Sequence, residues 1–311
     1  MRTTLVVVFA ALVLLGGCVR EKSETSTRGH LHILIAESTV PPALDEVKQF
    51  LNQFSNEGAN IDYQIVTTDQ ALGRLGRDSI RFVFSTRALS AMERQQLPQK
   101  DGFDLSEVLV AYDAVAVVVH EKNRVEGITT DELAKVLTGE LSRWEQLSKA
   151  NGMKGPVSVV LQDSSDITSY LTSYVLGGKP MRADFRHAGS SLEALQATAA
   201  QPLALSLAGI TWVDSAHAAV KVLEVAETRH NADTTFRVIP EAFGKFFSPH
   251  PANVYRSYYP LKRAIYASWY TPIGTLATGF GFFVSHADGQ RLFLKRNIVP
   301  GTQPIKLKGA E

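Results

Sequence analysis

Apolar and polar residues alternate in a way that predicts strands and helices in turn over the first third of the chain. Strands are expected at 30–37, 61–66 and 80–85, and a helix is expected after each of them. After the first strand, apolar residues recur at helical spacing, at Leu44, Val47, Phe50, Leu51 and Phe54. A β-α-β-α-β-α order predicts a parallel sheet with helices on its faces.

The remaining pattern continues as strands and helices with clear start signals. Residues 108–121 form a long apolar stretch that predicts one long strand or a strand pair. Capping boxes are expected where Ser90 precedes Glu93 and where Thr129 precedes Glu132. Further strands are expected at 159–162, 203–209 and 263–270, and two helices near the C-terminus, whereas 225–250 is predicted to be rich in loops.

Hydroxyl and carboxyl residues follow the predicted strands, where open α/β sheets gather their ligands. They form three loops, Ser38 and Thr39, then Ser85, Thr86 and Arg87, then Ser164, Ser165 and Asp166. The same residue types are also common as helix caps and turn residues. The pattern therefore indicates a ligand cleft, with local capping as the alternative for each loop.

The N-terminus predicts export. Arg2 precedes an apolar run from Leu5 to Leu15, which is too short for a permanent membrane span and is typical of a signal peptide over 1–17. The sequence Leu-Gly-Gly-Cys ends at Cys18, the only cysteine of the chain, and matches a bacterial lipobox. We expect a lipid on Cys18, followed by a flexible tether over 18–29.

Composition limits the classes of partner. The chain has 32 Lys and Arg against 31 Asp and Glu, and removal of the signal peptide takes away one Arg. Nucleic-acid-binding domains carry a basic surface, so this neutrality argues against a nucleic-acid partner. A length of 311 residues is typical of two domains.

Signals of catalysis or metal binding are weak. The sequence contains no G-x-S-x-G elbow, no H-E-x-x-H and no P-loop. His30 and His32 share a strand face next to the tether, where a surface position is the expected one. We therefore expect no metal, no cofactor and no enzymatic activity.

Several segments together resemble a known family. "STRALSAME", "AYDAVAVVVHEKNRVEGITTDELAKVLTGELSRWEQL", "YYPLKRAIY" and "FVSHADGQRLFLKRNIVP" occur in order along the chain. In this order they are similar to the periplasmic phosphate-binding proteins of ABC transporters, which have the type II binding-protein fold. Asp113, Asn123, Gly139 and Trp144 occupy positions that the family pattern specifies.

The resemblance implies an α/β fold of two lobes with mixed sheets, helices on both sheet faces and two crossing hinge strands. It assigns 30–117 plus 262–311 to lobe 1 and 118–261 to lobe 2. Asp113 and Arg263 would then be hinge residues rather than ligand contacts. The implied ligand loops coincide with the three loops named above, and the resemblance adds Gln162 and Thr168 to the third loop.

The third loop departs from the family pattern. Aligned on "VLGG" at its helix end, it has Gln162 where the family has Arg, Asp166 where it has Gly and Ile167 where it has Thr. Gln keeps one NH₂ donor without the charge that strengthens a bond to an oxyanion. Asp166 adds negative charge, and Arg87 is the candidate to compensate for it.

Three functions remain open from the sequence. The first is a monomeric, lipid-anchored binding protein on the periplasmic or extracellular face of a bacterial membrane, which captures phosphate or a related small oxyanion for an ABC permease. The second is an envelope lipoprotein of the same fold with another ligand, or with a sensor or scaffold role. The third is a phosphate-ester hydrolase, which no motif supports.

Overall fold

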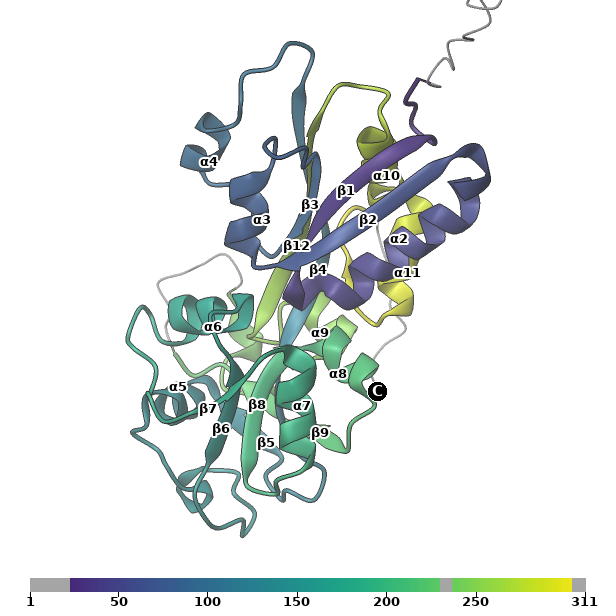
Figure 1. Ribbon diagram of the computed structural model, residues 1–311. Helices are drawn as coiled ribbons and strands as arrows, with labels where there is room; N and C mark the ends of the chain where they lie inside the picture. Colours follow the sequence, from purple (N-terminus) through teal and green to yellow (C-terminus); the bar gives the residue numbers. More distant parts are fainter. Residues whose placement is uncertain (1–22, 230–236, 304–311) are drawn as a thin grey trace, which may run out of the picture.

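The computed structural model describes residues 23–229 and 237–303 and divides them into two lobes (Figure 1). Strands β4 (Asp104–His120) and β12 (Lys262–Thr271) are antiparallel and lie where the lobes meet. Among the described residues the main sheet follows the order β2-β1-β3-β12-β4-β8-β6-β7, with β9 and β13 (Val299–Pro300) also paired to β4. This is the two-lobed α/β arrangement that the sequence predicts.

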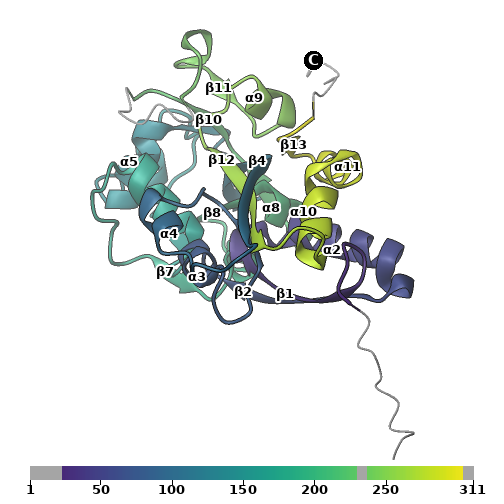
Figure 2. The ribbon, with the colours of Figure 1, turned by 90° about the horizontal axis from the view of Figure 1, so that it is seen from above.

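The first lobe begins with the predicted parallel strands. Strand β1 (Gly29–Ala36) pairs in parallel with both β2 (Ala59–Val66) and β3 (Phe82–Ser85), which confirms that prediction. The helices of this lobe are α2 (Val40–Phe54), α3 (Thr68–Arg74), α4 (Ala91–Gln95), α10 (Leu276–Ser285) and α11 (Ala287–Lys295). In Figure 2, α3 and α4 lie on the other side of the strands from α2, α10 and α11.

Alternation along β1 gives this lobe a core on each face of its sheet. Ile33 and Ile35 pack in one cluster with Phe50 of α2 and Phe280 of α10. Leu34, between them in sequence, points to the other face and belongs to the cluster beneath α3. A strand buried on both faces follows from this two-residue period.

Helix starts agree with their sequence signals. Ser90 and Glu93 form the predicted capping box of α4. Thr129 and Glu132 form that of α5 (Thr130–Thr138). A further capping box, of Thr67 with Gln70, begins α3 directly after β2. Such boxes satisfy backbone N–H groups that have no partner within the helix.

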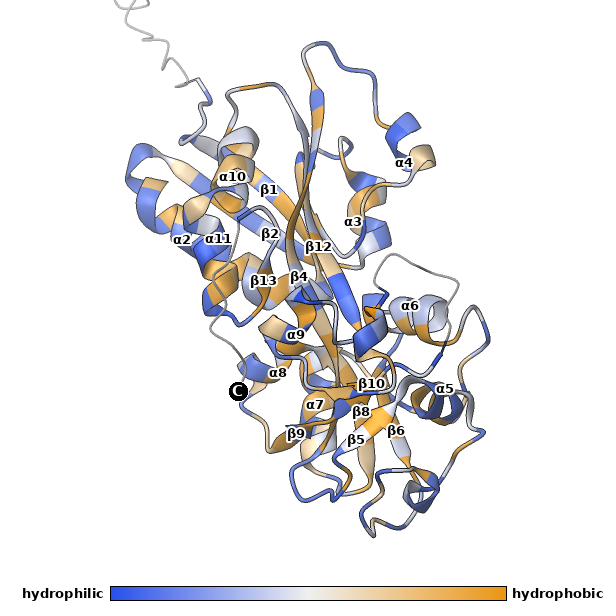
Figure 3. Cartoon of the chain, turned by 180° about the vertical axis from the view of Figure 1, so that it is seen from behind, coloured by the Kyte–Doolittle hydropathy of each residue, from blue (hydrophilic) through white to orange (hydrophobic). Residues whose placement is uncertain are grey.

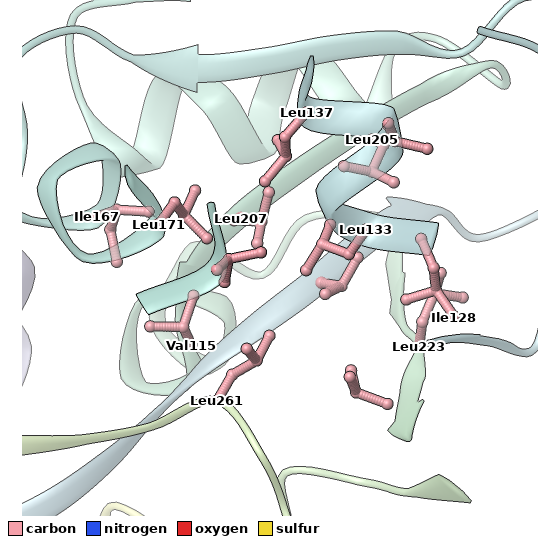
Figure 4. Packing of buried hydrophobic residues seen from close by; sticks show 14 of the residues in the cluster. Val115, Ile128, Leu133, Leu137, Ile167, Leu171, Leu205, Leu207, Leu223 and Leu261 are labelled. Atoms are coloured by element: carbon pink, nitrogen blue, oxygen red, sulfur yellow. The ribbon is translucent and has the colours of Figure 1, made fainter. Parts of the chain in front are cut away.

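The second lobe carries the rest of the sheet and a separate three-stranded sheet. Its elements are β5 (Gly127–Thr129), α5, β6 (Ser158–Gln162), α6 (Asp166–Tyr170) with a π-helical turn at Leu171–Val175, β7 (Arg186–Ala188), α7 (Ser191–Ala199), β8 (Ala204–Gly209), α8 (Ile210–Ala216), β9 (Val220–Val222), β10 (Glu224–Ala226), β11 (Phe246–Phe247) and α9 (Pro251–Tyr255). Figure 4 shows its core, in which Val115 and Leu207 from the sheet meet Leu133 of α5 and Leu171 beyond α6. Strands β4 and β8 are mostly apolar, whereas α5 carries polar residues (Figure 3).

Strand β4 belongs to both lobes. It pairs with β12 as far as Ala114 and with β8 from Val115 onward. The predicted boundary after residue 117 lies close to this change of partner. One continuous strand therefore replaces the strand pair that the sequence left as an alternative.

The described part of the predicted tether packs on the first lobe. A carboxylate oxygen of Glu24 accepts the backbone N–H of Leu276, the first residue of α10, and Glu24 also pairs with Arg81. The carbonyl oxygen of Ser26 lies so close to Gly279 that a Cβ there would be 1.8 Å from it. Residues 1–17 and Cys18 lie outside the described residues, and within those residues no helix has the length and apolarity to cross a membrane.

Candidate functional site

A cleft of about 380 Å³ lies between the lobes, where β1, β2 and β6 end. Its walls come from both lobes, and Trp212 of α8 is part of the wall that the second lobe contributes. The lining residues are Glu37, Ile65, Val66, Thr67, Gln70, Gln162, Asp163, Ser164, Ser165, Asp166, Gly189, Ser190 and Trp212. Strand ends from two lobes thus meet at one site, as expected for ligand binding in α/β folds.

Asp166 of the second lobe reaches into the first lobe. Its Oδ1 accepts the backbone N–H of Thr68 at 2.8 Å, and its Oδ2 accepts the hydroxyl of Ser38 at 3.2 Å. The side chain belongs to the first residue of α6 and is only 8% exposed. Two donors of the first lobe therefore already hold an oxyanion, which is the carboxylate of Asp166.

Glu37 makes the reverse connection. It follows β1 in the first lobe, and its carboxylate accepts the backbone N–H of Ser191 at 3.0 Å and the Ser191 hydroxyl at 2.9 Å. Ser191 begins α7 in the second lobe. Each lobe therefore places one carboxylate on donors at a helix start of the other lobe.

Burial dominates the electrostatics of both carboxylates. Removal from water raises the pKa of Asp166, and the Thr68 N–H and the charge of Arg263 oppose that rise. Burial likewise raises the pKa of Glu37, against the two hydrogen bonds from Ser191. Both groups thus depend on their donors to remain charged in the cleft.

The first predicted loop has one residue in the cleft network. Ser38 is 1% exposed and donates to Asp166. Thr39 is also buried, but its hydroxyl donates to the carbonyl of Ala36 at 2.9 Å. The Thr39 side chain therefore stabilises the local turn rather than facing a ligand, which is the alternative that the sequence left open for this loop.

The side chains of the second predicted loop bond within the first lobe and are not part of the cleft lining. The hydroxyl of Ser85 donates to the carbonyl of Arg87 at 2.8 Å, and Thr86 bonds to the Thr68 hydroxyl at 2.9 Å. Arg87 forms ion pairs with Glu93 and Asp69, each at 2.7 Å. Arg87 therefore compensates charge within the first lobe rather than in the cleft.

The third predicted loop lines the cleft. Gln162 and Ser164 are part of the wall, and Ser164 adopts a positive φ of 44° at the turn. Ser165 caps α6 by accepting the N–H of Thr168, and Ser165 N–H donates to the Thr168 hydroxyl at 2.8 Å. Thr168 thus holds the loop in shape, while Gln162, Ser164 and Asp166 face the cavity.

Several contacts of the site were not predicted from the sequence. Glu37, Thr68, Ser191 and Trp212 all contribute contacts there. Thr67 and Thr68 follow strand β2 in the same way as the predicted loops follow theirs, so this signal was available. Glu37 and Ser191 required knowledge of which strand ends face one another.

The charge of the lining is negative. Its described residues include Glu37, Asp163 and Asp166 and no Lys or Arg. The nearest buried cation is Arg263, which pairs with Asp113 at 2.6 Å and is 1% exposed. Nε and Nη1 of Arg263 have no hydrogen-bond partner, and its charge acts on both Glu37 and Asp166.

Metal binding has no support in the described residues. Among residues 23–229 and 237–303, no group of three His, Cys, Asp or Glu side chains is arranged to hold a metal ion. His30 and His32 instead both bond to the carboxylate of Asp62 at the surface.

Comparison with known proteins identifies the family to which this two-lobed fold belongs. A family model described as the PBP superfamily domain matches residues 21–287. The phosphate-binding protein PstS of Borreliella burgdorferi is 24% identical over 206 residues, 63% of this chain and 70% of that protein. Protein SphX of Synechococcus elongatus is 24% identical over 249 residues, 78% of this chain and 69% of that protein.

A solved structure has the same fold. It is an ABC-type phosphate transport receptor from Vibrio cholerae, with a TM-score of 0.62 and 17% identity, covering 86% of this chain and 99% of that one. The family model spans most of the chain, from the N-terminal part of the first lobe to α11. The chain therefore belongs to the PBP superfamily, the periplasmic binding proteins.

Proposed function

We propose that this chain is an extracytoplasmic binding protein that captures phosphate or a related small oxyanion between its two lobes and delivers it to an ABC permease. The observation that carries the proposal is the position of the Asp166 carboxylate, because donors of the first lobe hold this oxyanion inside the cleft. Neutral N–H and O–H groups aimed at one point suit an oxyanion. The relatives named as phosphate-binding proteins support the same ligand class.

The rest of the proposal concerns where the protein works. The mature chain is a monomer that begins at Cys18, and a lipid on Cys18 anchors it to a bacterial membrane. Closure of two lobes around a ligand is sufficient for capture, so the proposal includes no covalent step.

Calorimetric titration of the full chain tests this function. Inorganic phosphate should bind with one site per chain, and sulfate and molybdate serve as related oxyanions. Binding of phosphate that weakens in the Ser38→Ala variant supports the proposal, because that variant lacks one of the two donors. Absence of a response to all three anions, with an intact fold by circular dichroism, contradicts it.

A second candidate function is favoured by the charge of the cleft. Three carboxylates and no Lys or Arg among the described lining residues suit a ligand that brings hydrogen-bond donors or positive charge. The protein would then be an envelope lipoprotein of this fold with a sensor or scaffold role. A thermal-shift response to polyamines or amino sugars, without one to phosphate, would select this candidate.

A further inference from the structure

The two carboxylates of the cleft connect the lobes in opposite directions. Asp166 extends from the second lobe to Ser38 and Thr68 of the first. Glu37 extends from the first lobe to both donors of Ser191 in the second. These four hydrogen bonds involve the loops that follow β1, β2 and β6, together with the start of α7. They therefore join elements that are far apart in sequence.

Both connections exist only while the lobes are together. The Asp166 side chain is 8% exposed, and Ser38 and Ser191 are 1% and 2% exposed. Separation of the lobes would return these groups to water and break all four bonds. Bonds from N–H and O–H groups to a charged carboxylate are the stronger kind, so they favour the closed arrangement.

Asp166 also occupies the donors that the proposed ligand requires. The Thr68 N–H and the Ser38 hydroxyl each have the Asp166 carboxylate as acceptor. A phosphate oxygen at the same point would overlap with that carboxylate and would be repelled by its charge. An external oxyanion and Asp166 therefore compete for one position.

We propose that Asp166 and Glu37 form an intramolecular clasp, in which the chain's own carboxylates hold the cleft closed without an external ligand, and Asp166 must leave its donors before an oxyanion binds. The part that concerns competition rests on the proposed function; the part that concerns closure does not. The clasp lowers the apparent affinity by the fraction of molecules that are open, so its removal should increase affinity.

The clasp predicts a cross effect between the two connections. In the full chain with Asp166→Ala, amide hydrogen exchange should speed up at Ser191, which Asp166 does not touch. In Glu37→Ala, exchange should speed up at Thr68. A purely local role for each carboxylate predicts faster exchange only at its own partner, and that result would overturn the proposal.

Tryptophan fluorescence gives a second measure of opening. The indole N–H of Trp212 donates to the carbonyl of Glu37 at 3.0 Å, and Trp212 lines the cleft. Trp144 and Trp269 are buried at 0% and 5% exposure, so they should respond less. Asp166→Ala should shift the emission to longer wavelength and make it accessible to iodide. Emission identical to the wild type would contradict opening.

The matched control is Asp163→Ala. Asp163 lies on the same loop and lines the cleft, but it pairs with His187 at 2.5 Å within the second lobe. Its removal takes the same charge from the same wall without cutting a bond between lobes. Exchange at Ser191 and Trp212 emission should remain those of the wild type. Should either alanine variant at the clasp lose its fold, Asp166→Asn and Glu37→Gln replace them, with a cross effect in the same direction but smaller, because the amide oxygen can still accept one donor without the charge.

Titration with inorganic phosphate separates the clasp from the ligand assignment. Asp166→Ala should bind phosphate at least about tenfold more tightly than the wild type. The phosphate affinity of Asp163→Ala should differ from that of the wild type by less than about threefold. Equal affinity of wild type and Asp166→Ala would overturn competition while leaving the proposed function in place. Opening in both variants with no phosphate binding in any of them would support the clasp and contradict the proposed function.

Discussion

Arg263 donates a 2.6 Å hydrogen bond to Asp113 where β12 and β4 pass between the lobes, and both side chains are buried. Burial raises the pKa of Asp113, and the Arg263 charge is the main opposing influence. Each partner therefore depends on the other to be buried in charged form. The pair lies beside Gly209, where an added Cβ would be 2.7 Å from Asp113 Oδ2.

Removal of the cation alone should destabilise the protein strongly. We expect Arg263→Met to lower the free energy of unfolding by about 3–5 kcal/mol, because it leaves an uncompensated buried carboxylate. The double variant Arg263→Met with Asp113→Asn should recover a large part of that loss. Urea unfolding measures both, and a loss below about 1 kcal/mol in the single variant would show that the pair is not essential to the fold.

Loss of Arg87 should affect stability and leave the cleft unchanged. Arg87 pairs with Glu93, whose pKa it lowers to about 2, and with Asp69. Because the Arg87 side chain is 42% exposed, we expect Arg87→Ala to cost only about 1 kcal/mol. Phosphate affinity should change by less than about twofold, since Arg87 is paired with Glu93 and Asp69 and is not among the lining residues of the cleft. A large loss of affinity in calorimetry would place Arg87 in the site after all.

A positive charge at position 162 should strengthen oxyanion binding. Gln162 lines the cleft, its Nε2 lies 3.5 Å from the carbonyl of Gly189, and its Oε1 is buried without a partner. Gln162→Arg should raise phosphate affinity about tenfold, because a guanidinium adds a charged donor pair. The gain should shrink at high salt, and Gln162→Met serves as the uncharged control. No gain over that control would count against this loop as a ligand loop.

Glu46 should make the fold less stable as pH rises. It is 0% exposed on α2, neither carboxylate oxygen has a partner, and burial followed by the charge of Asp45 raises its pKa well above 4.5. Arg296 is paired with Asp45, the neighbour of Glu46 in sequence. The folded state therefore favours the protonated form of Glu46. The stability that this form contributes is fully present below pH 4.5 and is lost as pH rises through the folded-state pKa.

Glu46→Gln tests this dependence. The variant removes the ionisable group and nearly preserves its shape. At pH 8 it should be more stable than the wild type by about 1 kcal/mol or more, and at pH 4 the difference should disappear. Urea unfolding at the two pH values measures the change. An equal difference at both would mean that ionisation of Glu46 is not responsible.

The N-terminal segment should depend on a glycine of α10. An added Cβ at Gly279 would lie 1.8 Å from the carbonyl oxygen of Ser26, so Gly279→Ala must displace that segment. We expect a cost of about 1–3 kcal/mol and faster proteolysis after Arg28. Gly73 of α3 has open space around it, so Gly73→Ala is the matched control and should stabilise by up to about 1 kcal/mol. Equal behaviour of the two variants would contradict a docked segment.

Local signals in the sequence were sufficient for most elements. The capping boxes at Ser90 and Thr129 identified the starts of α4 and α5, because these bonds form within one turn. The alternating and then apolar pattern over residues 30–37 identified β1 as a strand. In the loop-rich stretch 225–250, the strands β10 and β11 escaped prediction because they are only 3 and 2 residues long and depend on pairing with each other and with the distant β5.

The site was harder to predict because side-chain direction depends on tertiary partners. Arg87 carried the right charge in the right loop, but Glu93 and Asp69 determine where it points. Asp166 looked like a disturbance of an anion loop, whereas the fold brings it onto donors of the other lobe. Glu37 and Ser191 meet only because the fold brings the ends of two strands opposite each other, and no local sequence pattern encodes that arrangement.

The docking of residues 24–28 on α10 also determines how a membrane-attached form would be positioned. Strand β1 runs from Gly29 to the cleft, so the entry point of the chain lies about 25 Å from the ligand site, at the far end of the first lobe (Figure 1). With a lipid on Cys18, the part of the tether between Cys18 and Ser23 would span at most about 20 Å. The far end of the first lobe would then stay close to the bilayer, and the cleft would lie at most about 45 Å from it, so a permease would have to receive the ligand within that distance.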